Sequence, residues 1–177
     1  MQVEVVAATA EQEPILANLI ELYAHDFSEI SDLHLDSNGR FGYTPLPLYW
    51  QESTRYPFLV KVDSNLAGFV FVKKGSEVSG DENVWDVAEF FIVRGHRRHG
   101  IGMKVAHEVW RKFPGRWEVR VTERNRAAQA FWSRAVASFM GSTIEASFAK
   151  ITGKSWHVFS FDTGLRQNVI KKEKQNE

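Results

Sequence analysis

The sequence contains no cysteine among its 177 residues, which excludes disulfides, thiolate metal sites and a cysteine nucleophile. It also lacks an apolar run of about 18 residues and the start pattern of a signal peptide, so we expect neither a membrane span nor secretion. An excess of one charge is missing too, since 22 basic residues balance 22 acidic ones. No charge signature therefore indicates binding to nucleic acid or to a membrane surface. A cytoplasmic location is the default expectation.

Hydrophobic residues make up 44% of the chain, which is enough for one substantial core. The sequence shows no internal repeat and no linker between domains. We therefore expect a single domain over residues 1–165. The charged stretch over residues 166–177 is predicted to be a disordered tail.

Hydrophobic periodicity predicts an alternation of strands and helices. The expected strands cover residues 2–7, 58–62, 66–72, 85–93, 117–122, 143–150 and 155–162. The expected helices cover residues 11–25, 101–113 and 126–136, with a short helical piece at 48–52. Because strand, helix and strand follow one another over residues 87–122, those two strands should be parallel. The predicted class is α/β of the α+β type: a mixed, mostly antiparallel sheet of about six to seven strands with one parallel pair and helices on both faces.

A basic, glycine-containing turn connects the strand at 85–93 to the helix at 101–113. The stretch reads VAEFFIVRGHRRHGIG over residues 87–102. The first amides of a helix are unpaired and lie at the positive end of its dipole, which suits an anion. Gly100 and Gly102 allow close approach of the backbone, and neighbouring arginines add charge. We interpret this turn as a phosphate-binding site.

Other interpretations of the same turn are a solvated charged loop and a nucleic-acid patch. The balanced net charge and the lack of interleaved aromatic residues disfavour nucleic acid. His96 and His99 have a spacing that a metal site could use, but no third ligand lies nearby in the sequence. We therefore expect no metal.

The motif RRHGIG at residues 97–102 resembles the Q/R-x-x-G-x-G/A signature of the GNAT superfamily of N-acetyltransferases. In that family the signature wraps the pyrophosphate of acetyl-CoA. The resemblance runs over residues 84–136 and includes NRAA at residues 125–128. It implies the GNAT fold, acetyl-CoA as the cosubstrate, and two parallel strands that splay apart to admit the pantetheine arm.

The resemblance also implies which residues bind the cofactor. Backbone amides of the turn hold the pyrophosphate, and the end of the preceding strand pairs with the pantetheine and supplies the oxyanion donor. The implied cofactor-binding residues are Ile92, Val93, Arg97, Arg98, His99, Gly100, Ile101, Gly102, Asn125 and Phe131. A helix N-cap would by itself explain Asn125, and a place in the core would explain Phe131.

Acyl transfer to an amine needs a base, because an ammonium group has no free electron pair. Glu89 is the first candidate, since it adjoins the apolar run at 90–93 and burial there would raise its pKa. Asp86 is the alternative, at a position further upstream where some family members place the base. In a regular strand Glu89 and Asp86 point to opposite faces. A purely structural role for Glu89 would be an ion pair with Arg120.

A proton donor for the departing thiolate is harder to assign. Many members of the family have a tyrosine at the position where this chain has Phe131 or Trp132. The tyrosines that could replace it are Tyr23, Tyr43 and Tyr49. We expect no dedicated acid, because a thiol pKa of about 8.5 makes the thiolate a good leaving group.

The predicted function is transfer of an acetyl group from acetyl-CoA to a primary amine. Direct attack in a ternary complex is favoured, because a covalent relay through cysteine is impossible. Aromatic residues in the segment 26–56 favour a small-molecule acceptor, although they would also suit a small satellite core. The alternative is a non-catalytic CoA-binding sensor or scaffold module. A homodimer through the last strands is possible.

Overall fold

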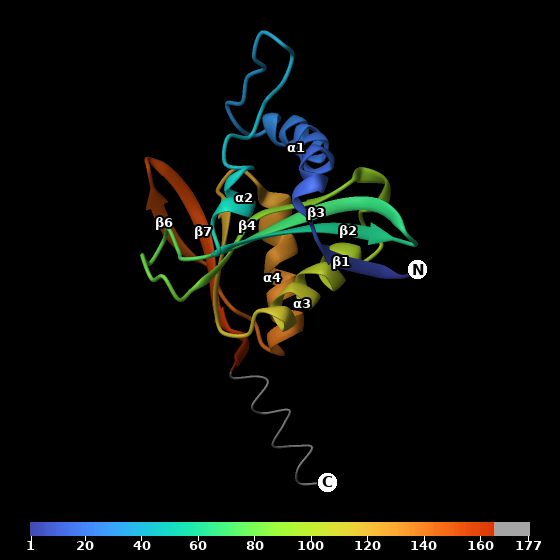
Figure 1. Ribbon diagram of the computed structural model, residues 1–177. Coiled ribbons are helices and arrows are strands. Elements are labelled where there is room, and N and C mark those ends of the chain that lie inside the picture. The colour runs from blue at the N-terminus through green and yellow to red at the C-terminus, as the bar shows by residue number, and fades with distance from the viewer. Residues whose placement is uncertain (165–177) are drawn as a thin grey trace. The chain divides into compact units, whose positions relative to one another are not determined.

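A computed structural model describes residues 1–164 (Figure 1), and the charged tail predicted over 166–177 lies outside them. The strands are β1 (Val3–Ala7), β2 (Arg55–Val62), β3 (Asn65–Lys74), β4 (Trp85–Ile92), β5 (Arg116–Thr122), β6 (Ser147–Ile151) and β7 (Lys154–Asp162). The helices are α1 (Glu13–Ser28), α2 (Leu48–Gln51), α3 (Ile101–Lys112) and α4 (Arg126–Met140), with short 3-10 turns η1 (Ala10–Gln12) and η2 (Arg94–His96). Within residues 1–164, no helix has the length and apolar character needed to span a bilayer.

The seven strands form one mixed sheet in the order β1-β2-β3-β4-β5-β7-β6. The pairs β1–β2, β2–β3, β5–β7 and β6–β7 are antiparallel. Strands β4 and β5 are parallel, with Trp85 opposite Trp117 and Asp86 opposite Glu118. The chain passes from β4 to β5 through α3, as the sequence predicted. The predicted fold class, with one parallel pair in a mostly antiparallel sheet, is confirmed.

The ends of several elements differ from the prediction. Helix α1 continues to Ser28, and the ring of Phe27 packs against Tyr23 one turn earlier at 5.5 Å. Helix α4 continues to Met140 because Phe139 is buried, and it ends where Gly141 adopts a left-handed conformation. Strand β6 starts at Ser147, four residues later than predicted.

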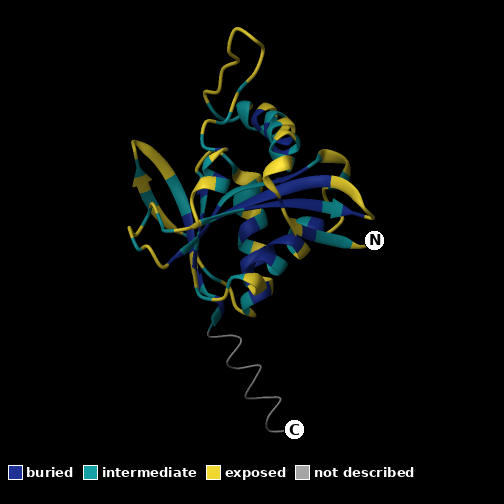
Figure 2. Cartoon of the chain, viewed as in Figure 1, coloured by how far each residue is buried: buried dark blue, intermediate teal, exposed yellow. Residues whose placement is uncertain are grey.

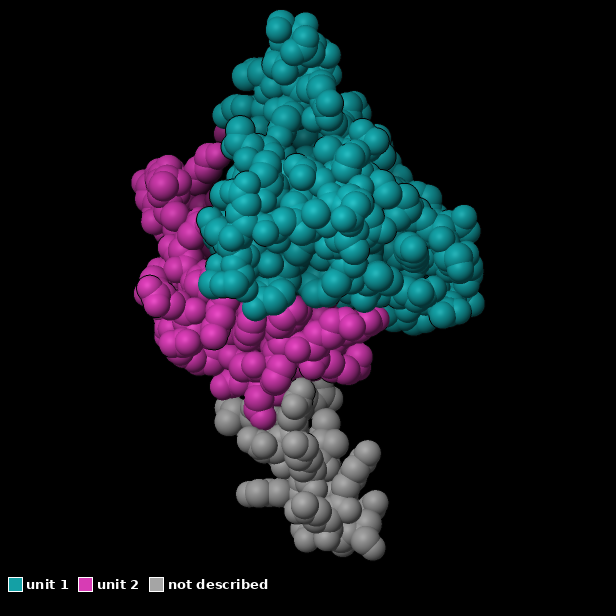
Figure 3. All heavy atoms as spheres, in the orientation of Figure 1, with its two compact units in different colours: residues 1–73, 88–105 teal, residues 74–87, 106–177 magenta. Residues whose placement is uncertain are grey.

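The structure divides into two compact units, coloured separately in Figure 3. Among the described residues, unit 1 comprises 1–73 and 88–105, and unit 2 comprises 74–87 and 106–164. The boundary passes through β4 and α3, so each unit contains part of both elements. The single domain expected over residues 1–165 remains a prediction.

The core of unit 1 is a cluster of aliphatic and aromatic side chains between α1, α2 and the strands β2 to β4 (Figure 2). Its buried members are Ala8, Leu16, Leu19, Ile20, Leu46, Tyr49, Leu59, Phe69, Phe71 and Phe91. The rings of Phe69 and Phe71 lie 4.8 Å apart, and Tyr49 packs on Phe71 at 4.2 Å. Tyr49 from the segment 26–56 therefore belongs to the main core of this unit rather than to a satellite cluster.

The core of unit 2 forms around Trp110 of α3, which is fully buried. Its ring contacts Phe139 of α4 at 5.2 Å, Phe161 of β7 at 4.9 Å and Trp132 of α4 at 6.1 Å. Edge-to-face and tilted contacts of this kind fill the space between helix and sheet with few polar atoms. Trp132 is thus a core residue.

Gly68 of β3 is required by the close approach of β4. A Cβ atom at this position would lie 2.0 Å from the carbonyl oxygen of Phe91 and 3.1 Å from the Cα of Ile92. We predict that Gly68→Ala destabilises the protein by roughly 2 kcal/mol or more, because backbone cannot move aside cheaply. The measurement is the midpoint of urea unfolding. Gly95→Ala is the control, since nothing lies within 4 Å of a Cβ there; equal midpoints for the two variants would contradict the prediction.

Candidate active site

The predicted phosphate-binding turn lies between the end of β4 at Ile92 and the start of α3 at Ile101. Arg98 and Gly100 both have left-handed backbones, with φ of 65° and 74°. This is uncommon for a residue with a side chain and curls the backbone sharply. The amide of Lys104 donates to the carbonyl of Gly100 at 3.1 Å, so the preceding amides belong to the unpaired first turn. Such a curled segment at a helix start is a favourable site for an anion.

The side chain of Arg97 is occupied by protein partners. Its Nη2 donates to Oδ2 of Asp26 at 2.5 Å, and its Nε donates to the carbonyl oxygen of Ile92 at 2.6 Å. The guanidinium also lies over the ring of Phe91, 5.5 Å from its centroid. Arg94 donates to the same Asp26 at 3.0 Å. The predicted phosphate-binding residue Arg97 therefore joins the turn to α1.

Asp26 carries the negative charge between these two arginines. Partial burial works against ionisation of its carboxyl group, but hydrogen bonds from Arg94 and Arg97 outweigh burial and hold the pKa of Asp26 below its usual range. The favourable contribution of this carboxylate is therefore present above its unfolded-state pKa of about 3.9 and is lost only as the pH falls through the lowered value. The ion pairs are intact at neutral pH.

The end of β4 has internal hydrogen bonds that the sequence did not reveal. The amide of Val93 donates to the carbonyl of Ala67 at 2.9 Å, and the carbonyl of Val93 accepts from the amide of His96 at 2.9 Å. The carbonyl of Ile92 accepts from Arg97. The backbone groups that the resemblance assigned to pantetheine at Val93 thus have protein partners in this structure.

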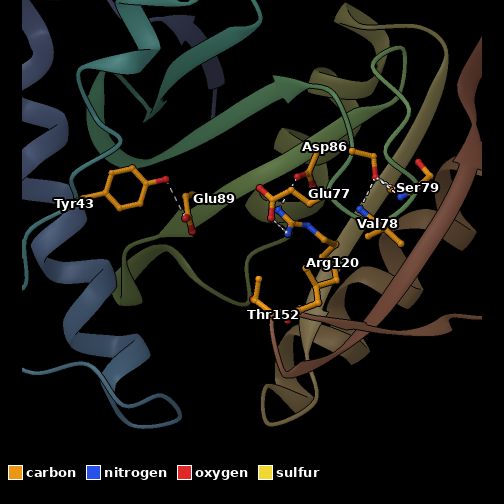
Figure 4. Close-up of polar contacts among 11 residues, drawn as sticks. Tyr43, Glu77, Val78, Ser79, Asp86, Glu89, Arg120 and Thr152 are labelled. Carbon is orange, nitrogen blue, oxygen red and sulfur yellow. Dashed lines mark hydrogen bonds and ion pairs between the residues drawn. The ribbon is translucent and has the colours of Figure 1, made fainter.

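Glu89, the predicted base, accepts hydrogen bonds from two tyrosines, and Figure 4 shows the one from Tyr43. The hydroxyl of Tyr23 on α1 donates to Oε2 at 2.7 Å. The hydroxyl of Tyr43, which precedes α2, donates to Oε1 at 3.1 Å. Both carboxylate oxygens are therefore fixed by groups from outside the strand.

Aromatic rings surround this hydrogen-bonded group. The ring of Tyr23 lies 5.8 Å from that of Phe69 and 5.9 Å from that of Phe91, while Tyr43 lies 6.0 Å from Phe71. Burial, together with the negative charge of Glu89, raises the pKa of Tyr23 and the pKa of Tyr43 well above the usual tyrosine value. Both hydroxyls therefore stay protonated and act as donors throughout the physiological range.

Glu21 of α1 holds the segment that carries Tyr43. Its carboxylate accepts from the amides of Phe41 at 2.9 Å and Gly42 at 3.0 Å. It also pairs with Arg40 at 3.5 Å. Tyr23 and Tyr43 stand among the candidate proton donors in the sequence, but no local signal indicates that they meet at Glu89, because the residues are far apart along the chain.

Asp86, the alternative base, is a buried ion-pair partner (Figure 4). Only 1% of its surface is exposed, and Nη2 of Arg120 donates to its Oδ2 at 2.8 Å. Nη1 of Arg120 donates to Glu77 at 2.7 Å. The ion pair with Arg120 that the sequence suggested for Glu89 is thus found at Asp86. Such a pairing is what allows a charged carboxylate to be buried.

The second part of the motif lies in unit 2. The side-chain oxygen of Asn125 accepts from the amide of Ala128 at 3.0 Å, which confirms the predicted N-cap of α4. Phe131 is half-buried and contacts Trp132, with ring centroids 4.8 Å apart. Their predicted contacts with the cofactor remain predictions. Among residues 1–164, no three histidine, aspartate or glutamate side chains are grouped as metal ligands.

The chain belongs to the acetyltransferase (GNAT) family, whose model matches residues 16–136. The match includes the turn, α3, β5 and most of α4. A search of curated proteins gave no match. Membership of the family makes the chain an acetyl-CoA-dependent acyltransferase, as the sequence motif predicted.

Solved structures share the fold at low sequence identity. An acetyltransferase from Thermus thermophilus has a TM-score of 0.67 and 18% identity, covering 92% of this chain and 97% of its own. The PaiA N-acetyltransferase from Thermoplasma acidophilum, in complex with coenzyme A, has a TM-score of 0.60 and 11% identity over 92% and 99%. Aminoglycoside acetyltransferase AAC(6')-Ib, also in complex with coenzyme A, has a TM-score of 0.68 and 10% identity over 91% and 95%.

We predict that Tyr43→Phe raises the titration midpoint of the Glu89 carboxyl group, because a hydrogen bond to a carboxylate favours its charged form. The measurement is a carbon-13 NMR titration of glutamate carboxyl groups, with Glu89→Gln identifying the signal. Tyr49→Phe is the comparison: burial raises the pKa of Tyr49 to about 12, and its hydroxyl interacts with Tyr43 and Arg55 and does not donate to Glu89. A midpoint that moves equally in both variants, or in neither, would refute the role of Tyr43.

Proposed function

We propose that this protein transfers the acetyl group of acetyl-CoA to a primary amine of a small molecule, by direct attack in a ternary complex. Glu89 acts as the general base. The observation that carries the proposal is the hydrogen bonding of both Glu89 oxygens by Tyr23 and Tyr43 within an aromatic surround. It rests on the family membership of residues 16–136.

The cofactor is proposed to bind through backbone rather than through arginine side chains. The amides of residues 98–102 would hold the pyrophosphate, since the left-handed Arg98 and Gly100 curl this segment at the start of α3. Close approach is possible because nothing lies within 4 Å of a Cβ position at Gly100. Asn125 and Phe131 stay as further proposed contacts of the cofactor.

Glu89 is preferred over Asp86 because of the partners that each carboxylate has. A base must accept a proton from the amine, and a carboxylate in an ion pair with a buried arginine resists protonation. Asp86 has such a partner in Arg120, whereas the tyrosine hydroxyls that donate to Glu89 are neutral. The hydrogen bonds from Tyr23 and Tyr43 also fix the orientation of the Glu89 carboxylate relative to the amine. Glu89 can thus serve the reaction while Asp86 stabilises the strand.

A dedicated acid is not required in this mechanism. The ammonium group loses one proton to Glu89, the freed lone pair attacks the thioester carbonyl, and the tetrahedral intermediate releases the CoA thiolate. The nitrogen then loses its second proton to the departed thiolate or to solvent, which leaves the neutral amide. A thiolate with a conjugate-acid pKa of about 8.5 leaves unaided. The attack takes place with both substrates bound, so initial-rate plots should intersect.

A small amine is the preferred acceptor because the base lies among aromatic side chains. Tyrosine and phenylalanine rings attract an ammonium group and pack on an apolar body. Homodimer formation through the last strands remains a prediction. The alternative function, a CoA-binding sensor without catalysis, would bind the cofactor and leave Glu89 without a role.

We predict that acetyl-CoA and CoA raise the unfolding temperature while ATP and NAD do not. A ligand that binds only the folded state adds about 2.7 kcal/mol at a hundred times its Kd. For a chain of this length that corresponds to a shift of several degrees. Thermal unfolding with each ligand at one saturating concentration is the measurement. A shift with ATP alone, or none with CoA, would overturn the proposed cofactor.

We predict that Glu89→Gln lowers kcat by about a hundredfold or more and leaves CoA affinity unchanged, because loss of a general base costs about two to four orders of magnitude. Initial rates with a panel of small amines test this. Asp86→Asn is the matched comparison and should lower the unfolding temperature instead, since it leaves Arg120 without a buried counter-charge. Full turnover in Glu89→Gln would favour another base, and CoA binding without turnover of any amine by wild type would favour the sensor.

A further inference from the structure

We propose that Asp26 is a positioning residue for coenzyme A, acting through Arg97 on the end of β4 and the turn that follows. The inference rests on the proposed use of CoA by this turn. It assigns Arg97 a task different from direct contact with phosphate, which is what a basic residue in this motif would first suggest.

The geometry places Asp26 between α1 and the turn. Asp26 lies in the last turn of α1, with 20% of its side chain exposed. Its two oxygens take different partners: Oδ1 accepts from Arg94 and Oδ2 from Arg97. A carboxylate that uses both oxygens on two arginines can fix two points of the turn at once.

Arg97 transmits this contact to the strand end. A guanidinium presents its donors in a rigid fork, so fixing one nitrogen orients the others. In Arg97, Nη2 is held by Asp26 and Nε donates to the carbonyl of Ile92. The stacking of this group over Phe91 limits its rotation further. Arg97 thus ties the last residue of β4 to α1 and leaves its positive charge compensated by Asp26.

The turn is held by its own backbone hydrogen bonds and leads into the proposed phosphate-binding loop. The amide of His96 donates to the carbonyl of Val93 at 2.9 Å, and the amide of Arg97 donates to the carbonyl of Arg94 at 3.1 Å. The next residue is Arg98, whose left-handed backbone begins the curl. The direction of the following amides therefore depends on where the backbone of Arg97 is held. An anion site built from amides is sensitive to such positioning, because its donors must point at one place.

The same turn of α1 also holds the proposed base. Tyr23 precedes Asp26 by three residues, which places both on one face of the helix. Tyr23 donates to Glu89, so α1 contacts β4 near its middle. Asp26 bonds Arg97, which in turn bonds the carbonyl of Ile92 at the end of β4. Asp26 is thereby connected to cofactor binding without touching the reacting atoms.

The experiment compares CoA affinity, measured by titration calorimetry, in wild type and in Asp26→Asn. We expect binding to be about five- to thirtyfold weaker in the variant, within the range found for residues that influence a ligand site without touching the ligand. If Arg97 were instead a phosphate ligand restrained by Asp26, the substitution would release it and CoA would bind more tightly. Tighter or unchanged binding overturns the proposal.

Arg97→Gln and the double variant test whether the two residues act as one unit. We expect the double variant to bind CoA no more weakly than whichever single variant binds it less tightly, because Asp26→Asn and Arg97→Gln break the same connection. Additive losses would mean that Arg97 touches the cofactor independently of Asp26. Arg97→Lys keeps the charge but lacks the fork, so it should also weaken CoA binding even where Asp26→Asn fails to fold; wild-type affinity in this variant would overturn the proposal.

Glu52→Gln is the matched control. It also removes one negative charge and one arginine partner, since Glu52 accepts from Arg55 at 2.6 Å at an exposed position. CoA affinity should be unchanged in this variant, and a loss equal to that of Asp26→Asn would mean that general charge causes the effect. A wild-type protein that binds no CoA would overturn the proposed function itself, whereas wild-type binding with an unaffected Asp26→Asn overturns only the role of Asp26.

Discussion

The hydrogen bond from Tyr23 to Glu89 holds a carboxyl group at the border of an aromatic core. A carboxylate in such surroundings is costly unless donors replace the water it has lost. Tyr23 from α1 and Tyr43 from the following segment supply those donors. These two hydrogen bonds therefore connect Glu89 on β4 both to α1 and to the segment that follows α1. Structure and proposed chemistry meet at Glu89.

The two carboxylates of β4, Asp86 and Glu89, have different hydrogen-bond partners. Asp86 and Glu89 lie three residues apart on β4, so a regular strand directs them to opposite faces. Asp86 meets a buried arginine and becomes part of an ion pair. Glu89 meets neutral hydroxyls and aromatic rings. The same functional group is thus held in a buried ion pair in one case and by neutral hydroxyl donors in the other, which is the difference on which the proposed role of Glu89 rests.

In the turn after β4, the backbone and the side chains have different roles. Its glycine and its left-handed Arg98 shape a row of amides, a feature that depends on local conformation. Its arginines Arg94 and Arg97 form ion pairs with α1, a feature that depends on a residue about seventy positions away. The basic residues of the proposed phosphate-binding loop therefore need not all be directed at the phosphate. Here part of the charge holds the loop in place.

The sequence by itself determined the strand order of local hairpins, the parallel unit around α3, the N-cap at Asn125 and the family, because periodicity, turn residues and the RRHGIG motif are local signals. It also named Glu89 and Asp86 without deciding between them. Tertiary structure decided that Asp86 pairs with Arg120, that Tyr23 and Tyr43 meet at Glu89, and that Arg97 bonds Asp26. These contacts join residues distant along the chain, and only packing of α1 against the sheet brings those at Glu89 and Arg97 within hydrogen-bonding distance.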